Sequence, residues 1–416
     1  MNSRGVKIGL DIGTSMVRAV AAEMVPDEPM RVIGVAEVAC DGLQNGTIVD
    51  VESTSAAITE CLARLEESAG IKPQEVTVGI SGEHIVSLNC EGVIRITEPS
   101  EKGDQEGLEI TSDDVDQVLE AAKAVGLPNG RQIIHVIPQQ FLVDDQKGIR
   151  NPVRMIGSRL EAHVHLVTSA INATKNIVSA VKRAGVRVNE LVLEPLAAAQ
   201  ASISPEERQI GVCLIDIGAG NTDIIVLGKY GVQYSRSLPV GSMHISSDIA
   251  KILRITEEQA ETLKLEYGTC YTSDASSDKV FEVKGIGERA DRNLNEAELA
   301  MYIEARMDEI LRLITQDLGI KGAFNHMNSG IVFTGGGSQL RGLLPLARKI
   351  FNLPVRIARP QGFDDPNGDL DRPEFSVAAG LVSWSAKHHG QQGVMIDKKL
   401  FSRWLNKVGI FFKENF

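Results

Sequence analysis

Two short segments of the chain hold the residues whose types and spacing best suit chemistry. KIGLDIGTSMVRAV begins at Lys7 and VCLIDIGAGNTDIIVLG begins at Val212. Each runs from an apolar stretch through Asp-Ile-Gly and a turn of small residues into a second apolar stretch, which predicts a β-hairpin. Glycine lets backbone N–H groups approach an anion, and an aspartate beside phosphates suits a magnesium ion held through its water shell. One such turn could be a plain hairpin, but two copies predict two similar domains that clamp a polyphosphate.

A third segment, IVFTGGGSQLRGL from Ile331, joins an apolar strand to a glycine-rich turn. Gly335, Gly336 and Gly337 follow the strand, and Ser338 is placed to start the next helix. A helix N-terminus after such a turn offers free N–H groups to an anion or a nucleoside. The alternative is a tight strand-to-helix turn that holds no ligand.

The stretches between these motifs alternate between strand and helix patterns. A strand is predicted at 75–81, a helix at 169–185, and an Ala-rich helix with proline in its first turn from Pro195. This order predicts an α/β architecture in which the helix from Pro195 crosses from the first domain to the second. The acidic run at 110–123 predicts a helix with Ser112 as its N-cap.

Length and composition fit a globular protein with more than one domain. The 416 residues are 43% hydrophobic and 24% charged, and the formal net charge is −12. That charge argues against nucleic acid as the main partner. The five cysteines are scattered and form no Cys-x-x-Cys pair, so we expect neither disulfides nor a zinc site. No secretory signal and no run of about 18 apolar residues is present, so we expect a cytoplasmic protein.

The last residues, KKLFSRWLNKVGIFFKENF (398–416), are aromatic and basic in a chain of which aromatics make up 4%. At 100° per residue, large apolar side chains share one face of a helix and the cations lie opposite or beside them. This pattern is typical of a helix in a membrane interface, and the alternative is a final helix packed on the protein's own body. The polar stretch 386–397 predicts a flexible linker. The apolar face consists of Leu400, Phe401, Trp404, Leu405, Val408, Phe411 and Phe412.

Four motifs in order, DIGTS, LEPLAAAQ, DIGAGNTD and TGGGSQLRG, resemble those of the actin/Hsp70/sugar-kinase ATPase superfamily. The stretches 135–168 and 239–253, with the terminal segment, narrow the resemblance to the FtsA family of bacterial cell-division actin homologues. It implies an actin/Hsp70-like ATPase fold of the α/β class, with two related lobes around a nucleotide cleft, a relocated subdomain IC and a C-terminal amphipathic helix. The implied subdomains are IA at 1–85 and 166–195, IC at 86–165, IIA at 196–231 and 300–385, and IIB at 232–299.

The resemblance also implies roles for residues in the cleft, with ATP and Mg²⁺ as ligands and slow hydrolysis at most. Asp11 and Asp216 would lie near the metal, and Glu194 would orient a water, although it could simply be an acid favoured at a helix N-terminus. Lys264 with Glu261 would meet the nucleoside, and the alternative for this pair is a surface salt bridge. The other implied nucleotide contacts are Gly13, Thr14, Ser15, Gly218, Gly220, Asn221, Thr222, Gly335, Gly336 and Ser338.

At the level of function, the resemblance implies a protein that polymerises on the inner membrane, anchors FtsZ filaments there at the division septum and recruits later division proteins. The FtsZ C-terminal peptide would dock on IIB, where Arg289 and Arg292 suit an acidic peptide; the alternative is an ordinary solvated loop. The rival interpretations are a pilus-assembly actin homologue and a soluble sugar kinase or chaperone ATPase. The terminal helix disfavours the pilus-assembly homologue and the sugar kinase. Too few residues follow the second phosphate motif for a chaperone.

Overall fold

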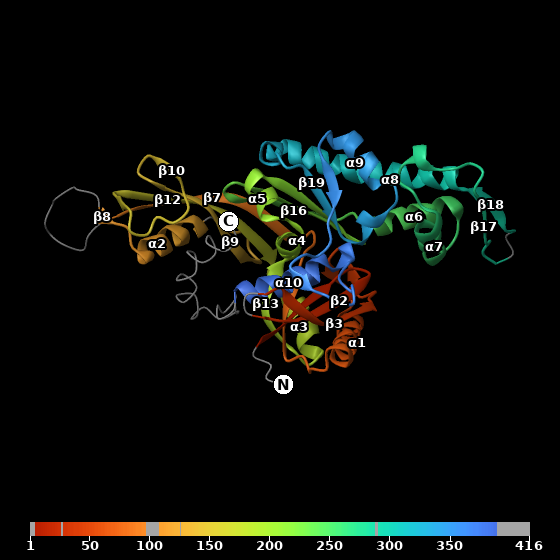
Figure 1. Cartoon of the computed structure of the whole chain (residues 1–416), viewed down its shortest axis with the longest axis horizontal. Helices are drawn as coiled ribbons and strands as arrows, with labels where there is room; N and C mark the ends of the chain where they lie inside the picture. The colour runs from red at the N-terminus through yellow and green to blue at the C-terminus, as the bar shows by residue number, and fades with distance from the viewer. Residues whose placement is uncertain (1–4, 26–27, 97–107, 125, 288–289, 389–416) are drawn as a thin grey trace.

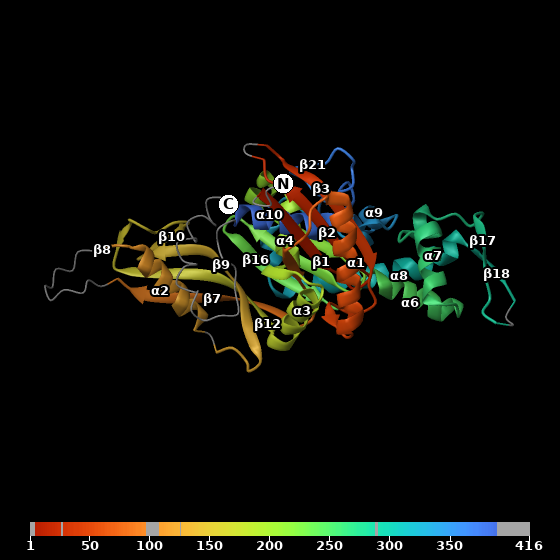
Figure 2. The same cartoon turned by 90° about the horizontal axis from the view of Figure 1, so that it is seen from below.

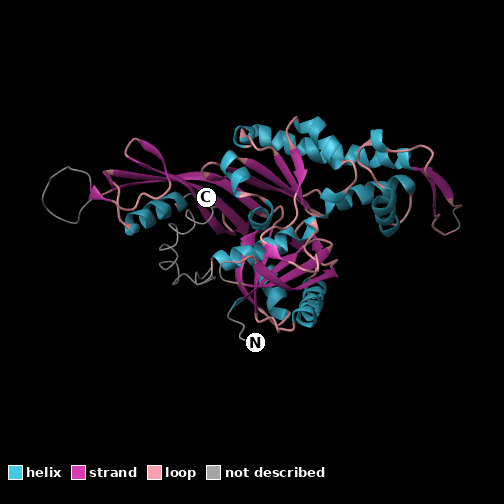
Figure 3. Cartoon of the chain, in the orientation of Figure 1, coloured by secondary structure: helices cyan, strands magenta, loops and turns pink. Residues whose placement is uncertain are grey.

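The computed structural model describes residues 5–25, 28–96, 108–124, 126–287 and 290–388. These residues form two α/β lobes, and an arm extends from each lobe in opposite directions (Figure 1). Strands fill the centre of both lobes and most of one arm, whereas helices dominate the other arm (Figure 3). The fold confirms the expected α/β architecture with two lobes.

The first lobe is built on a six-stranded sheet with helices on both faces. Its elements are β1 (Val6–Ile12), β2 (Met16–Glu23), β3 (Met30–Ala39), β4 (Leu43–Gln44), β5 (Thr47–Ile48), α1 (Val51–Ala69), β6 (Glu75–Ile80), α3 (Ile171–Arg183), β13 (Arg187–Leu193), β21 (Phe363–Asp364) and α10 (Ser376–Lys387). The strand order is β13-β6-β1-β2-β3-β21, with β1 antiparallel to β2 and parallel to β6. α1 and α3 cover one face, and α10 packs on β1 from the other (Figure 1).

The second lobe repeats this arrangement around a five-stranded sheet. Its elements are α4 (Glu194–Ser202), α5 (Pro205–Ile210), β14 (Val212–Ile217), β15 (Thr222–Gly228), β16 (Gly231–Leu238), α8 (Glu296–Ile320), β19 (Ile331–Thr334), α9 (Leu343–Phe351) and β20 (Val355–Ile357). The order is β16-β15-β14-β19-β20, with β14 antiparallel to β15 and parallel to β19. Asp11 and Asp216 occupy matching places, each one residue before the end of its strand. The predicted repeat is therefore present in the structure.

The two arms are insertions at opposite ends of the long axis (Figure 2). The first contains β7 (Ile85–Arg95), β8 (Leu108–Glu109), α2 (Ser112–Lys123), β9 (Arg131–Val143), β10 (Gln146–Ile149), β11 (Ile156–Gly157) and β12 (Arg159–Ala170). Its main sheet has the order β10-β9-β12-β7, and α2 closes a separate apolar core against it. The second arm contains α6 (Ser242–Leu253), α7 (Glu257–Tyr267), β17 (Val280–Val283) and β18 (Arg292–Asn295).

The predicted N-cap of α2 is wrong by one residue. Thr111, not Ser112, is the cap: its hydroxyl accepts the N–H of Asp114 at 3.3 Å, and the Asp114 carboxylate accepts the N–H of Thr111 at 2.8 Å. This reciprocal capping box satisfies two N–H groups, whereas a cap at Ser112 would satisfy one. The helix predicted at 169–185 is α3, which begins at Ile171 because β12 extends to Ala170.

Helices α4 and α10 pack closely between the lobes, and a glycine makes this approach possible. A Cβ added at Gly380 of α10 would lie 1.9 Å from the carbonyl oxygen of Ala197 in α4. We therefore expect Gly380→Ala to lower the free energy of unfolding by about 3 kcal/mol, because the backbone of one helix must shift. Urea denaturation measures the loss. Gly126→Ala, where an added Cβ meets nothing within 4 Å, is the control, and equal losses for both would contradict this packing argument.

Candidate functional site

The two turns predicted to bind phosphate lie against each other at the centre of the molecule. In each turn the first glycine donates its N–H to the carbonyl three residues later, at 3.0 Å for Gly13 and 2.9 Å for Gly218. The repeat therefore extends to the bond that closes the turn. A Cβ at Gly220 would lie 2.6 Å from the hydroxyl oxygen of Thr14, so the second turn can reach the first because this residue is glycine.

The turns form part of the wall of a cavity between the lobes, with a volume of about 80 Å³. This cavity alone holds only part of a small molecule, since small-molecule sites are about 300–1,000 Å³. A second, larger cavity adjoins it and shares lining residues from both turns and from the glycine-rich turn after β19. The predicted site residues that line the first cavity are Asp11, Gly13, Thr14, Ser15, Glu194, Asp216, Gly218, Gly220, Asn221, Gly335 and Gly336. The fold thus brings four separate sequence motifs to one place.

Lys264 and Glu261 line the adjoining cavity from α7. The Lys264 ammonium donates to the Glu261 carboxylate at 2.7 Å and to the carbonyl of Ser242 at 3.1 Å. The Lys264 side chain is 7% exposed and the Glu261 side chain is 41% exposed, so the ion pair has one buried and one exposed member. Burial lowers the pKa of Lys264, and the neighbouring carboxylate opposes this shift.

Two residues predicted to contact the nucleotide line neither cavity in the described part of the chain. The Thr222 hydroxyl donates to the carbonyl of Val240 at 2.8 Å, and the Ser338 hydroxyl donates to the carbonyl of Gly335 at 2.7 Å. Ser338 also does not start α9 as predicted, because it lies in a separate 3-10 turn, η4 (Gly336–Gln339). The Ser338 hydroxyl thus holds the shape of its own turn, and the Thr222 hydroxyl ties the start of β15 to the segment after β16.

Five carboxyl groups line the first cavity: Glu374, which is paired with Arg372, and a buried group of four, Asp11, Glu194, Asp216 and Asp223. Burial raises the pKa of Asp11 and of Asp223 to about 6 and raises the pKa of Asp216 and of Glu194 well above the usual range. Repulsion from the other acids adds to the shift for Asp11, Asp216 and Glu194, and the nearby Arg18 opposes it for both Asp11 and Asp216. Clustered acids of this kind hold protons or bind a hard divalent cation through oxygen. The donor set fits Mg²⁺.

The position of Glu194 at the junction of a strand and a helix brings its side chain to the cavity. Glu194 is the first residue of α4, directly after β13, and Pro195 fixes the first turn of the helix. Its side chain lies over Gly79 of β6, where an added Cβ would be 2.8 Å from the Glu194 Cγ atom. Gly79 also lines the cavity. None of the sequence motifs predicts a role for this glycine.

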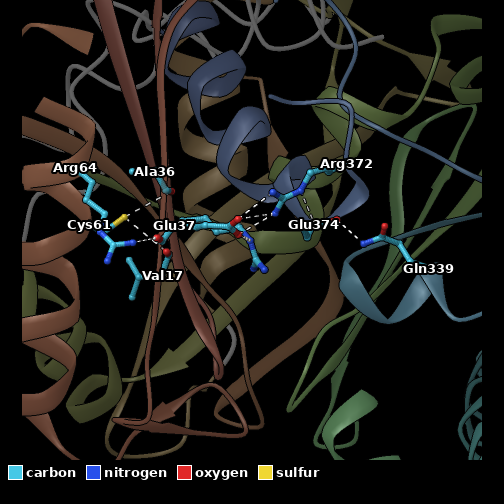
Figure 4. Close-up of polar contacts among 9 residues, drawn as sticks. Val17, Ala36, Glu37, Cys61, Arg64, Gln339, Arg372 and Glu374 are labelled. Carbon is cyan, nitrogen blue, oxygen red and sulfur yellow. Dashed lines mark hydrogen bonds and ion pairs between the residues drawn. The ribbon is translucent and has the colours of Figure 1, made fainter. Parts of the chain in front are cut away.

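A chain of ion pairs crosses the mouth of the site (Figure 4). Arg372 donates to the Glu37 carboxylate through both terminal nitrogens at 2.9 Å, and its Nε donates to Glu374 at 2.8 Å. Glu374 in turn accepts from the Gln339 amide at 2.6 Å. Arg18 lies beside the same Glu37, with Nε 3.4 Å from the carboxylate. These residues connect strands of the first lobe to the glycine-rich turn of the second.

Of the residues predicted to bind a partner or the membrane, only Arg292 lies in the described part of the chain. Arg292 lies at the start of β18 and donates to the carbonyl of Leu253 at 2.8 Å, so this part of the predicted loop is a strand. Arg289 and the terminal segment 398–416 lie outside the described residues. Within the described ranges, no helix is both long and apolar enough to cross a membrane.

Comparison with known proteins identifies the family. Residues 213–380 match the family model described as cell division protein FtsA, and residues 82–168 match that of the SHS2 domain inserted in FtsA. The FtsA of Pseudomonas aeruginosa is 35% identical over 91% of this chain and 88% of its own length, and that of Escherichia coli K12 is 31% identical over 99% of both. This chain belongs to the FtsA family. The SHS2 match falls on the arm formed by β7–β12.

Solved structures show the same fold at low sequence identity. The PilM–PilN type IV pilus biogenesis complex contains a chain with a TM-score of 0.66, 17% identical, covering 91% of this chain and 98% of that one. MreB5 of Spiroplasma citri bound to ADP has a TM-score of 0.54 at 17% identity, covering 91% and 95%. Both likenesses concern the fold alone. The pilus interpretation loses its support, because the relatives at 31–35% identity are FtsA proteins.

Proposed function

We propose that this FtsA-family protein binds ATP with Mg²⁺ between its lobes and uses the bound state to assemble on the inner membrane. The observation that carries the proposal is the convergence of two matching Asp-Ile-Gly turns on one cavity that holds the buried acids Asp11, Glu194, Asp216 and Asp223. Turns of this kind suit phosphates, and the acids suit the metal. MreB5 of the same fold has been solved with ADP and with AMPPNP, which supports a nucleotide as the ligand.

Different residues in the cleft suit the metal, the phosphates and the nucleoside of such a ligand. Asp11 and Asp216 would hold Mg²⁺ through its water shell, and the bound ion would neutralise phosphate charge. Arg18, which sequence reasoning missed, is placed to add a positive charge at the first turn. Lys264 and Glu261 would meet the nucleoside from the adjoining cavity.

Hydrolysis is expected to be slow. Glu194 is the candidate that orients a water toward the terminal phosphate, because it begins the crossing helix and lines the cavity. Burial and the neighbouring acids raise its pKa well above the usual range. A carboxyl group that retains its proton accepts a proton from water poorly, so the direction of this shift favours slow hydrolysis, with ATP chiefly a structural and polymerisation ligand.

The membrane and partner functions rest on the sequence. The apolar face of 398–416 would lie in anionic lipid at the cytoplasmic side of the inner membrane, and IIB with Arg289 and Arg292 would receive the FtsZ C-terminal peptide. Partial burial of seven apolar side chains is offset by the cost of ordering the segment. A single copy would therefore bind weakly, and copies joined in a filament would bind firmly because each later segment engages at high effective concentration. Such filaments would anchor FtsZ at the septum and recruit later division proteins.

Sedimentation with phosphatidylglycerol-containing liposomes tests this proposal. The full chain with MgATP should sediment with liposomes and carry FtsZ down, whereas a chain ending at Gly390 should stay in solution with its FtsZ. Trp404→Glu is the matched variant of full length. Because it places a charge on the apolar face, it should stay in solution as the shortened chain does. If the shortened chain sediments as well as the full one, the terminal segment is not the anchor. If MgATP does not alter sedimentation of the full chain, the nucleotide does not control assembly.

A further inference from the structure

Three aromatic rings form a stack where the first arm, the first lobe and the end of α10 meet. His135 of β9 and Trp384 of α10 make an edge-on contact with centroids 5.7 Å apart and planes at 66°. Trp384 and His388 stack with centroids 4.2 Å apart and planes at 23°. The ring nitrogen Nδ1 of His388 also donates to the carbonyl of Trp384 at 2.8 Å. The rings thus form one continuous contact from β9 to the end of α10.

One end of the stack holds the backbone beside Glu194. The Nε2 atom of His135 accepts the N–H of Leu193 at 3.0 Å. Leu193 ends β13, which is an edge strand, and it is the residue directly before Glu194. Burial lowers the pKa of His135 to about 4, with His388 adding to the shift, so the imidazole is neutral and available as an acceptor near pH 7. His135 therefore fixes the point where the chain passes from the sheet to the crossing helix.

The other end of the stack lies where the described chain ends. His388 is the last described residue, and the sequence continues through 389–416 to its aromatic, basic end. α10 cannot move alone, because Gly380 lies against the backbone of α4 and Gly9 of β1 lies against that of α10. Residue 388 is therefore connected to the region beside Glu194 both by the ring contacts and by the packing of α10 on α4.

We propose that the His135–Trp384–His388 stack couples the nucleotide cleft to the point at which the terminal segment leaves the body of the protein. His135 is a positioning residue for Glu194, and Trp384 links it to residue 388. This inference rests on the proposed binding of ATP and of lipid. Because coupling is reciprocal, nucleotide binding alters the affinity for lipid by the same factor as lipid binding alters the affinity for nucleotide.

The fluorescence emission of Trp384 provides the readout for this coupling. The chain contains two tryptophans, so Trp404→Phe in the full chain leaves Trp384 as the single emitter. Addition of MgATP should shift its emission, while binding is measured separately by calorimetry.

His135→Gln keeps an acceptor for Leu193 but removes the ring, so it should retain nucleotide affinity and lose the emission shift. His135→Leu removes both and should also weaken nucleotide binding about fivefold, the loss expected for one hydrogen bond. His163→Leu, on the neighbouring strand β12, should match the parent.

The outcomes separate this inference from the proposed function. If calorimetry detects no nucleotide binding, both fail. If nucleotide binds and Trp384 emission stays unchanged, or if His135→Leu binds as the parent does, only the coupling fails. In the reverse experiment, phosphatidylglycerol vesicles should change the nucleotide Kd of the parent and leave that of His135→Gln unchanged. An unchanged Kd in the parent, with the protein fully sedimented on the vesicles, overturns the coupling; failure to sediment overturns the anchor and the coupling together.

Discussion

Asp216→Asn should abolish MgATP binding and at the same time make the nucleotide-free protein more stable. Asp216 shares the cavity with other carboxyl groups, and repulsion from Asp223 and Asp11 adds to burial in raising its pKa. Asparagine carries no charge at any pH, so the substitution relieves the repulsion in that cluster and raises the free energy of unfolding. The same change removes a ligand for the water shell of the metal. Calorimetry with MgATP and urea unfolding without it measure the two effects.

The cluster also sets the direction of the pH dependence. The folded-state pKa of Asp11 and of Asp223 is about 6, above the ordinary value of 3.8. Between these values the folded state binds more protons than the unfolded state, so stability falls as pH rises. Without Mg²⁺, the parent should lose stability from about pH 4 to above pH 6, and Asp216→Asn should lose less. Mg²⁺ should restore more stability at pH 8 than at pH 5, because it competes with protons.

An exposed aspartate provides the control for both measurements. Asp145→Asn, on the first arm, should leave MgATP binding and the pH dependence of unfolding as in the parent, since this residue is exposed and distant in sequence from every cleft motif. Parental affinity for MgATP in Asp216→Asn would contradict the assignment of the second turn to the metal. A loss of binding accompanied by a loss of stability would instead indicate that Asp216 has a structural role.

The sequence predicted the parts of the site that are local. Each hairpin depends on an apolar strand, a turn of small residues and a second strand, and all three are adjacent in the chain. Asp223 was also within reach: it lies directly opposite Asp216 across the β14–β15 hairpin, as Arg18 lies opposite Asp11 across β1–β2. Attention to the cross-strand partner of each aspartate would have found both.

Other parts of the site depend on contacts between residues far apart in the chain. The pair Glu37–Arg372 joins residues 335 positions apart, and an isolated glutamate and arginine give no signal of such a pairing. The sequence around Gly79 gives no signal either, because the need for glycine there comes from the Glu194 side chain that lies over it. The hydroxyls of Thr222 and Ser338 belong to predicted motifs, yet both donate to backbone carbonyls and line neither cavity, since motif membership does not determine which way a side chain points.

Gly335→Ala and Gly336→Ala, one residue apart in the same motif, should behave very differently. Gly335 has φ 81° and ψ 164°, a region essentially restricted to glycine, where another residue costs about 1–3 kcal/mol. A Cβ there would also lie 2.1 Å from the carboxylate oxygen Oδ1 of Asp216 and 2.7 Å from the carbonyl of Ile217. At Gly336 the nearest atom is the Cβ of Glu374 at 4.0 Å, and φ is not positive. The glycine run therefore contains one demanding position and one tolerant position.

Gly335→Ala should lose MgATP binding and stability together, because the added methyl group displaces both Asp216 and the end of β14. Gly336→Ala should retain the stability of the parent, and the methyl group it adds to the cavity wall should change nucleotide affinity only modestly. Calorimetry and urea unfolding on the two variants give the comparison. Equal behaviour would show that the glycines serve the ligand directly. The expected difference would show that the first glycine serves Asp216: the backbone of the third motif passes so close to the aspartate of the second that no side chain fits between them, which makes these two distant motifs one site.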